Sequence, residues 1–165
     1  MIVTNRFGMS ECWMHAYRNL EYDQLGWRSV TTLIAPPRSK ILQERHDADI
    51  TVDITDLMWL IVGSGAHEIL ARTSVAGIIN EQRFILNHKG REISMKPDWL
   101  ERLSPEYVAK HHPAMMGKVC YRLDDFKFTT VWAAQKALSE GGRIEYEAQL
   151  NLYRFGLMKQ CGFNV

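Results

Sequence analysis

The segment at residues 118–128, KVCYRLDDFKF, predicts a β-strand in the second half of the chain. The run is rich in β-branched and aromatic residues and stops before Thr129-Thr130, which is the pattern of a strand. Side chains alternate between the two faces of a strand, so Asp125 and Lys127 point the same way and Asp124 points with Phe126. The sequence therefore predicts a carboxylate and an ammonium group side by side on one face of a sheet. A plain ion pair on a solvated edge would also have this pattern.

A second carboxylate follows a predicted hairpin. An apolar stretch over residues 78–86, a turn at 87–90 and a return strand ending at Pro97-Asp98 give the hairpin pattern. Proline lacks the donor that a sheet ladder needs, so Asp98 is expected where the return strand leaves the sheet. Mg²⁺ prefers oxygen ligands and is commonly bound by one or two carboxylates plus water and phosphate. Asp98 and Asp125 would form such a pair.

Upstream, residues 56–71 predict a helix with one apolar side. Three residues could cap its N-terminus: Asp53, Thr55 and Asp56. Gly63 and Gly65 interrupt the helix, and each costs about 1 kcal/mol relative to alanine. Their presence therefore needs a reason, such as the close approach of another backbone. His67 follows at once, and a single histidine on a helix can equally be a satisfied core or surface residue.

The first 52 residues are expected to form a helical extension. Residues 10–20 and 39–46 predict helices, with Pro36-Pro37 between them. A stripe of aromatic residues in this region could stack on unpaired bases, or could belong to the core. The stripe consists of Trp13, Tyr17, Tyr22 and Trp27.

The order of these features resembles the RecB-like branch of the PD-(D/E)xK nuclease superfamily. The matching motifs, over about residues 53 to 158, are GxxxH at Gly63 and His67, Glu81 opening the hairpin, Asp98, Asp125-Phe126-Lys127, and QxxxY at Gln149 and Tyr153 on a closing helix. Small phage exonucleases are the most similar members. The resemblance implies an α/β fold with a restriction-endonuclease-like core, a central mixed sheet flanked by helices, and a single domain over residues 1–165 whose nuclease core is 53–165.

The resemblance also implies roles for the residues that match. The metal, Mg²⁺ or Mn²⁺, would be held by His67, Asp98, Asp125 and the backbone carbonyl of Phe126. Lys127 would orient or deprotonate the attacking water, and His67 could instead touch the scissile phosphate. Gln149 and Tyr153 are four residues apart, which places both on one helix face. The role of Glu81 stays open.

Two features depart from the family pattern. About 26 residues separate Asp98 from Asp125, where many relatives have a short hairpin, and the extra piece within residues 99–117 predicts a short helix over 105–111 plus a loop. The chain also ends twelve residues past Tyr153, where many relatives continue. It is therefore expected to be either a minimal domain or a fragment.

Composition is that of one soluble domain. A chain of 165 residues is long enough for one hydrophobic core. No apolar run approaches the roughly 18 residues that span a membrane, and residues 1–13 lack the apolar segment of a signal peptide. A cytoplasmic location is expected, in the host cell if a phage encodes the protein. An iron–sulfur cluster is not expected, because Cys12, Cys120 and Cys161 cannot form the four-cysteine set of some relatives, so reduced, mostly buried thiols are expected instead.

DNA is the expected partner. The formal net charge of +1 gives no overall basic signature. Local phosphate contacts could come from Arg38, Lys40, Arg45, His46 and residues 110–112. The expected activity is metal-dependent DNA cleavage, by an exonuclease if the phage resemblance holds, with a recombination or replication protein as a further partner. The alternatives are an inactive nuclease fold kept as a nucleic-acid-binding subunit, and a structural protein in which Asp125 and Lys127 form only an ion pair.

Overall fold

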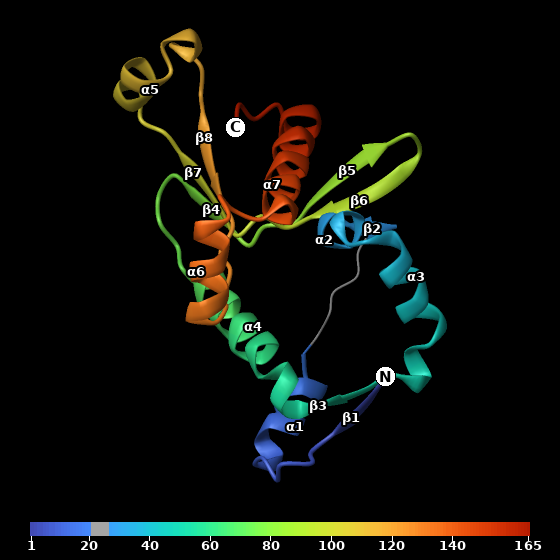
Figure 1. The fold of residues 1–165 in the computed structure, drawn as a ribbon. Coiled ribbons are helices and arrows are strands. Elements are labelled where there is room, and N and C mark those ends of the chain that lie inside the picture. Colours follow the sequence, from blue (N-terminus) through green and yellow to red (C-terminus); the bar gives the residue numbers. More distant parts are fainter. Residues whose placement is uncertain (21–26) are drawn as a thin grey trace.

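The computed structural model describes residues 1–20 and 27–165 as a mixed α/β protein (Figure 1). The helices in these ranges are α1 (Glu11–Arg18), α2 (Val30–Ile34), α3 (Pro37–Arg45), α4 (Met58–Ala71), α5 (Pro105–His111), α6 (Val131–Ser139) and α7 (Ile144–Gly156). The strands are β1 (Ile2–Thr4), β2 (Arg28–Ser29), β3 (Thr51–Asp53), β4 (Ile78–Asn80), β5 (Phe84–His88), β6 (Arg91–Met95), β7 (Trp99–Arg102) and β8 (Tyr121–Asp124). None of the helices in the described ranges is long and apolar enough to cross a bilayer.

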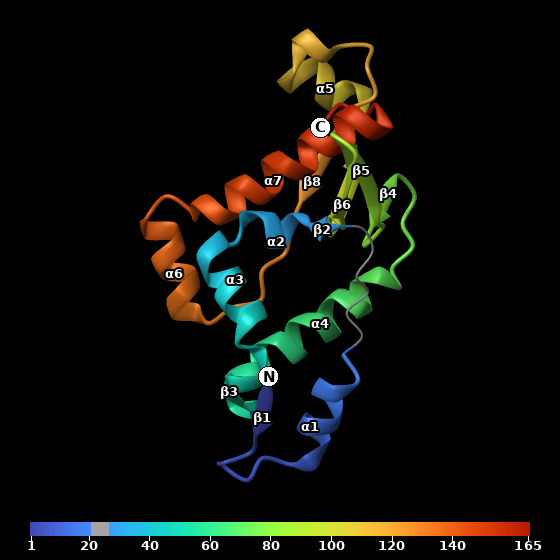
Figure 2. The ribbon, with the colours of Figure 1, turned by 90° about the vertical axis from the view of Figure 1, so that its right-hand side faces the viewer.

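Among the described residues, the strands divide into three sheets. Strands β1 and β3 form a parallel pair. Strand β6 pairs with β2 in parallel and with β5 antiparallel, which makes a mixed sheet. Strands β4, β7 and β8 form an antiparallel sheet. The expected α/β class and a mixed sheet are confirmed, but the strands do not join into one central sheet. Helix α7 runs between the two three-stranded sheets (Figures 1 and 2).

The two three-stranded sheets are separated by a break in one long hairpin. Asn80 pairs with Trp99 in β4 and β7, and Phe84 pairs with Met95 in β5 and β6. Three residues lie between the paired segments on each strand, so the register is the same on both sides of the break. The hairpin predicted over residues 78–98 is confirmed, and it continues through the break into β7.

The causes of the break are local. Pro97 has no N–H to give to a ladder. On the facing strand Glu81, which lies opposite Asp98, has a φ of 51°, in the left-handed region that costs a non-glycine residue about 1–2 kcal/mol. At the other end of the hairpin, Lys89 and Gly90 also have positive φ, 50° and 75°. Those values suit a tight two-residue hairpin turn, so the turn predicted at 87–90 is confirmed.

The helix predicted over residues 56–71 is also confirmed. A 3₁₀ turn over Ile54–Leu57 leads into α4, and Asp53 Oδ1 caps that turn by accepting the N–H of Thr55 at 3.2 Å. The suggested close approach of another backbone is wrong. A Cβ on Gly63 would meet only the Phe128 side chain, at 3.7 Å, and one on Gly65 would meet nothing within 4 Å.

The C-terminal half contains one correction to the predicted strands. Strand β8 ends at Asp124, so it covers only part of the strand predicted over 118–128. The helix predicted over 105–111 is confirmed as α5, and the helix predicted to carry Gln149 and Tyr153 is confirmed as α7.

The N-terminal 52 residues are not only helical. Helices α1 and α3 confirm the two predicted helices within one or two residues at most ends. However, β1, β2, α2 and the start of β3 also lie here, and β2 belongs to the mixed sheet. Trp13 and Tyr17 are partly buried on α1, whereas Trp27 is half-exposed. Tyr22 lies outside the described residues.

The three cysteines are free thiols. Cys120 is buried, Cys161 is partly buried and Cys12 is exposed on α1. The expectation of mostly buried thiols is therefore wrong for Cys12.

A cluster of buried hydrophobic residues joins α7 to the mixed sheet. Val30, Leu86, Met95 and Tyr153 are buried together there. Gly156 lets α7 lie close to β6, since a Cβ at that position would overlap the Met95 Sδ atom and come within 3.5 Å of Leu86 Cδ2. A larger residue at this point would force the buried Met95 side chain to move.

We expect Gly156→Ala to destabilise the protein by about 1–3 kcal/mol, because the added methyl group overpacks the contact with Met95. Gly65→Ala is the matched control. It adds the same methyl group to open space on α4 and should stabilise the fold by up to about 1 kcal/mol. The free energy of unfolding of both variants, from urea titration, checks this. Equal effects of the two substitutions would contradict the packing of α7 on β6.

Candidate metal centre

Three carboxylates lie at the level where the strands break. The register of β4 and β7 continues into Glu81 opposite Asp98, and the Glu81 N–H donates to the Asp98 carbonyl at 3.2 Å. Trp99 pairs with Asp124 in β7 and β8, so the same register continues into Asp98 opposite Asp125. Glu81, Asp98 and Asp125 therefore form a row across three neighbouring strands.

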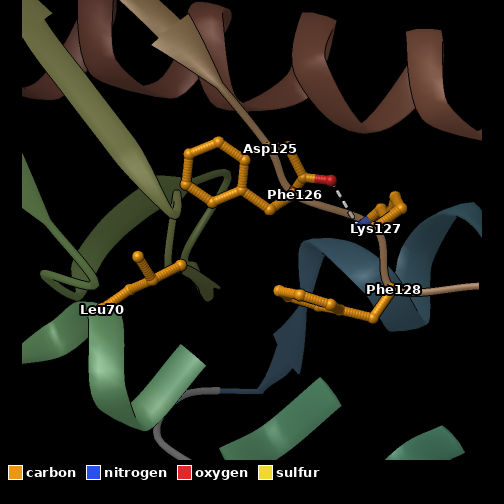
Figure 3. A pocket seen from close by; sticks show the side chains of 5 residues that line it. All are labelled: Leu70, Asp125, Phe126, Lys127 and Phe128. Carbon is orange, nitrogen blue, oxygen red and sulfur yellow. Dashed lines mark ion pairs between the residues drawn. The ribbon is translucent and has the colours of Figure 1, made fainter. Parts of the chain in front are cut away.

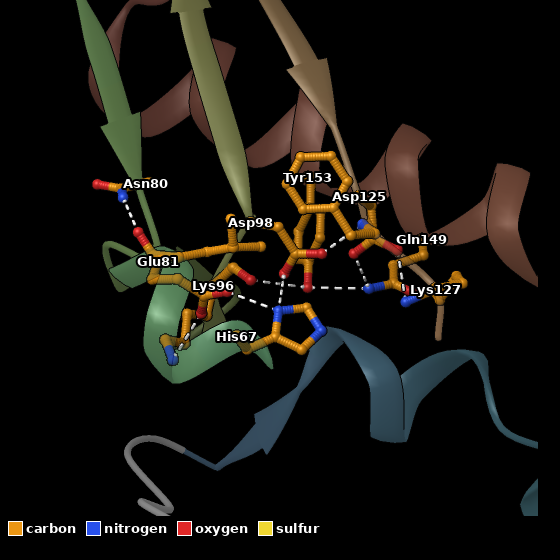
Figure 4. A network of polar contacts seen from close by, with 11 residues as sticks. His67, Asn80, Glu81, Lys96, Asp98, Asp125, Lys127, Gln149 and Tyr153 are labelled. Carbon is orange, nitrogen blue, oxygen red and sulfur yellow. Dashed lines mark hydrogen bonds and ion pairs between the residues drawn. The ribbon is translucent and has the colours of Figure 1, made fainter. Parts of the chain in front are cut away.

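His67 on α4 completes a compact cluster with two of these acids (Figure 4). Its Nδ1 lies 2.6 Å from Glu81 Oε1 and 3.4 Å from Asp98 Oδ1. One ligand atom from each of the three residues lies within 4.8 Å of the others. Ionised carboxylates only accept hydrogen bonds, so Nδ1 donates to them when no cation is bound, and it would have to lose that proton to become a metal ligand. Two carboxylate oxygens and an imidazole nitrogen suit a cation such as Mn²⁺, and the oxygens also suit Mg²⁺.

An amide side chain places α4 against the strands. The Nδ2 of Asn80, the last residue of β4, donates to the carbonyls of Leu70 and Thr73 at 2.5 and 2.9 Å. Leu70 lies in the last turn of α4, and Thr73 lies just beyond the helix. His67, one turn earlier on the helix, is thereby held over Glu81, the residue that follows Asn80.

Asp98 is the acid of the row that accepts a backbone hydrogen bond from Phe126. Its side chain is 9% exposed, and one oxygen accepts the Phe126 backbone N–H at 2.5 Å. Burial raises the pKa of Asp98 to about 6; the Phe126 N–H opposes this shift, while the negative charge of Asp125 adds to it. Phe126 thus contacts the site through its N–H, whereas the sequence pointed to its carbonyl.

Asp125 has partners of its own. Lys127 forms an ion pair with it, as the shared strand face predicts, and the Gln149 amide donates to its Oδ1 at 2.8 Å. The three-residue cluster contains Glu81 where the sequence pointed to Asp125. Asp125 lies beside the cluster, close enough for its charge to act on Asp98.

Helix α7 supports the site through the two residues of the QxxxY pattern. Gln149 Nε2 lies 3.0 Å from the Tyr153 hydroxyl, as expected for side chains four residues apart on one face. The hydroxyl donates to the Lys96 carbonyl at 3.3 Å. Burial raises the pKa of Tyr153 to about 12, so this hydroxyl stays protonated at neutral pH.

Sequence reasoning missed Lys96. Its Nζ lies 2.7 Å from Glu81 Oε2, on the side of Glu81 away from His67. A signal was present, because Lys96 precedes Asp98 by two residues and strand alternation places both on one face. That signal is weak without knowledge that Glu81 lies opposite.

The site opens into a groove of ≈ 700 Å³. The face of α4 that carries His67 forms one side, together with Ser64, Glu68 and Ala71. Beside the groove, Leu70, Phe126 and Phe128 form a shallow apolar pocket with Asp125 and Lys127 (Figure 3). The Phe128 ring also meets His67 edge-on, with the ring centroids 5.4 Å apart.

The basic side chains of the groove differ from those that the sequence indicated. Within residues 1–20 and 27–165, the lysines and arginines that line it are Arg83, Lys96 and Lys127. The residues expected to contact phosphate do not line it: Arg38, Lys40 and Arg45 lie on α3, His46 follows α3, and residues 110–112 lie on or beside α5 (Figure 1).

Comparison of the chain with models of protein families, with curated proteins and with solved structures finds no match.

The raised pKa of Asp98 leads to a stability prediction. The pKa rises from 3.8 to about 6 on folding, so ionising Asp98 disfavours the folded state. This destabilisation of the folded state is absent below about pH 4 and complete above about pH 6. At pH 8 in EDTA, the free energy of unfolding of Asp98→Asn should therefore exceed that of the wild type by about 1–3 kcal/mol, and the variant should melt at a higher temperature. This difference in stability should shrink toward pH 4.

Thermal unfolding at both pH values measures this effect. Asp124→Asn serves as the control, since Asp124 is exposed and pairs with Arg122. A stabilisation by Asp98→Asn that does not change with pH would show that the charge of Asp98 is not its cause.

Proposed function

We propose that the protein is a Mg²⁺- or Mn²⁺-dependent deoxyribonuclease with a restriction-endonuclease-like core. The observation that carries the proposal is the row of Glu81, Asp98 and Asp125 at a shared strand break, with His67 on one side and Lys127 on the other. Buried acids gathered in this way are expensive unless a cation or another partner neutralises them.

His67, Glu81 and Asp98 would hold the cation. Their ligand atoms already converge, and the Glu81 and Asp98 side chains are 5% and 9% exposed. A bound divalent cation would supply positive charge to the phosphate and to the attacking water. Asp98 also has an outer contact of the kind that metal sites need, the hydrogen bond from the Phe126 N–H.

Lys127 would act on the attacking water. Its side chain is 35% exposed, so it reaches the groove, whereas its partner Asp125 is 6% exposed. Gln149 holds Asp125 from the opposite side. Asp125 would therefore aim the Lys127 ammonium group, which can hold the water in line with the phosphorus by a hydrogen bond.

The groove suits a DNA strand. Arg83, Lys96 and Lys127 supply positive charge for phosphates. The rings of Phe126 and Phe128 lie beside Lys127 and offer an apolar surface to a sugar or a base. The protein would then need no basic surface elsewhere, in keeping with a net charge of +1.

A second candidate is an inactive nuclease fold that binds nucleic acid. It is favoured by the pairing of both lysines: Lys127 with Asp125 and Lys96 with Glu81. These pairs neutralise two of the three acids without a metal. Salt-sensitive DNA binding without cleavage would support this candidate.

Two adjacent acids test the site. Asp125→Asn should lower the rate of cleavage on the order of 100-fold or more, because the loss of its charge releases Lys127. Asp124→Asn should keep most of the rate, since Asp124 turns away to Arg122. Linear, circular and single-stranded DNA incubated with Mn²⁺, Mg²⁺ or EDTA give the rates and show whether ends are needed.

Glu81→Gln separates the cluster from the lysine pair. It keeps the shape of Glu81 but removes a cluster charge, so cleavage should fall as far as in Asp125→Asn. The proposed deoxyribonuclease activity fails if purified wild-type protein cleaves none of the three substrates with either metal. Equal activities of the Asp124 and Asp125 variants would instead reject only the assigned face.

A further inference from the structure

Lys96, the residue that follows β6, places a positive charge beside the cluster. Its ammonium group lies 2.7 Å from Glu81 Oε2, and the other oxygen of the same carboxylate lies 2.6 Å from His67 Nδ1. Glu81 is thus held between a lysine and the imidazole (Figure 4). Its carboxylate is 5% exposed, so water can do little to replace either partner.

The backbone of Lys96 is fixed, but its side chain is not. Tyr153 donates to the Lys96 carbonyl, and Pro97 restricts the preceding residue to an extended conformation. The side chain is 44% exposed and lines the groove. A lysine has four rotatable carbons between its backbone and its charge, so the ammonium group can leave Glu81 without movement of the strand.

A metal ion at the cluster would weaken the attraction between Lys96 and Glu81. Lys127 already pairs with Asp125. A divalent cation held by His67, Glu81 and Asp98 would be balanced by the two carboxylates. Lys96 would then face a neutralised carboxylate and a nearby positive ion, which repels it.

We propose that Lys96 competes with the metal ion for Glu81, lowers the affinity of the site for metal, and turns into the groove when the cation binds. The inference rests on the proposed function, since it requires a metal site at His67, Glu81 and Asp98. It assigns Lys96 as a positioning residue that acts on the metal through Glu81.

The test is Mn²⁺ binding to DNA-free protein, read from the electron paramagnetic resonance signal of free Mn²⁺. Lys96→Met removes the charge and keeps the length of the side chain, so it should bind Mn²⁺ about tenfold more tightly than the wild type. Lys96→Arg retains the charge and should bind Mn²⁺ about as weakly as the wild type. Lys110→Met, on α5, is the matched control for loss of one positive charge and should leave the affinity unchanged.

A double variant identifies the route of the effect. Glu81→Gln removes the carboxylate for which Lys96 and the metal ion compete. In this background, Lys96→Met should therefore no longer tighten Mn²⁺ binding. The inference is overturned if Lys96→Met binds Mn²⁺ no more tightly than the wild type, or if Lys110→Met tightens binding equally; the proposed function survives both outcomes. Absence of Mn²⁺ binding by the wild type and by Lys96→Met alike would reject the metal site itself.

Discussion

The site depends on the interruption of hydrogen bonding at one level of three strands. A continuous ladder would have used the backbone groups of these residues and pointed the side chains along an ordinary sheet. At the break, side chains take over: the Asp98 carboxylate accepts the Phe126 N–H. The register survives the gap, so Glu81 and Asp98 still lie opposite each other. At the break the Asp98 side chain therefore replaces a backbone partner of Phe126, while the flanking ladders keep the three acids aligned.

Electrostatics then determine how the row is neutralised. Each acid has a different set of partners: Glu81 has His67 and Lys96, Asp98 has the Phe126 N–H and His67, and Asp125 has Lys127 and Gln149. Asp98 is the acid without a lysine among these contacts, and burial raises its pKa. The carboxylates are buried, whereas their cationic partners reach the groove.

Local patterns predicted the elements better than their assembly. Period-two alternation placed Asp125 with Lys127, and a four-residue spacing placed Gln149 with Tyr153; both contacts depend only on neighbouring residues. The place of Glu81 in the cluster, and its contact with Lys96, depend on the left-handed backbone of Glu81 opposite Asp98, which alternation does not reveal. The pairing of β2 with β6 joins residues more than sixty positions apart, so propensity alone could not have indicated it. The strand predicted to reach Phe128 ends at Asp124 because its partner β7 begins only at Trp99.

Helix α7 links the core to the site through one face. Gln149, Tyr153 and Gly156 are all buried along it, roughly two helical turns from first to last. Gly156 touches the Met95 side chain, Tyr153 contacts the strand at Lys96, and Gln149 holds Asp125. One rigid helix therefore connects the core contact at Met95 with Asp125 in the site. A change in core volume near Met95 would shift α7 and with it the Gln149 amide that orients Asp125. Packing defects in the core would therefore displace Asp125 and Lys127 in the groove.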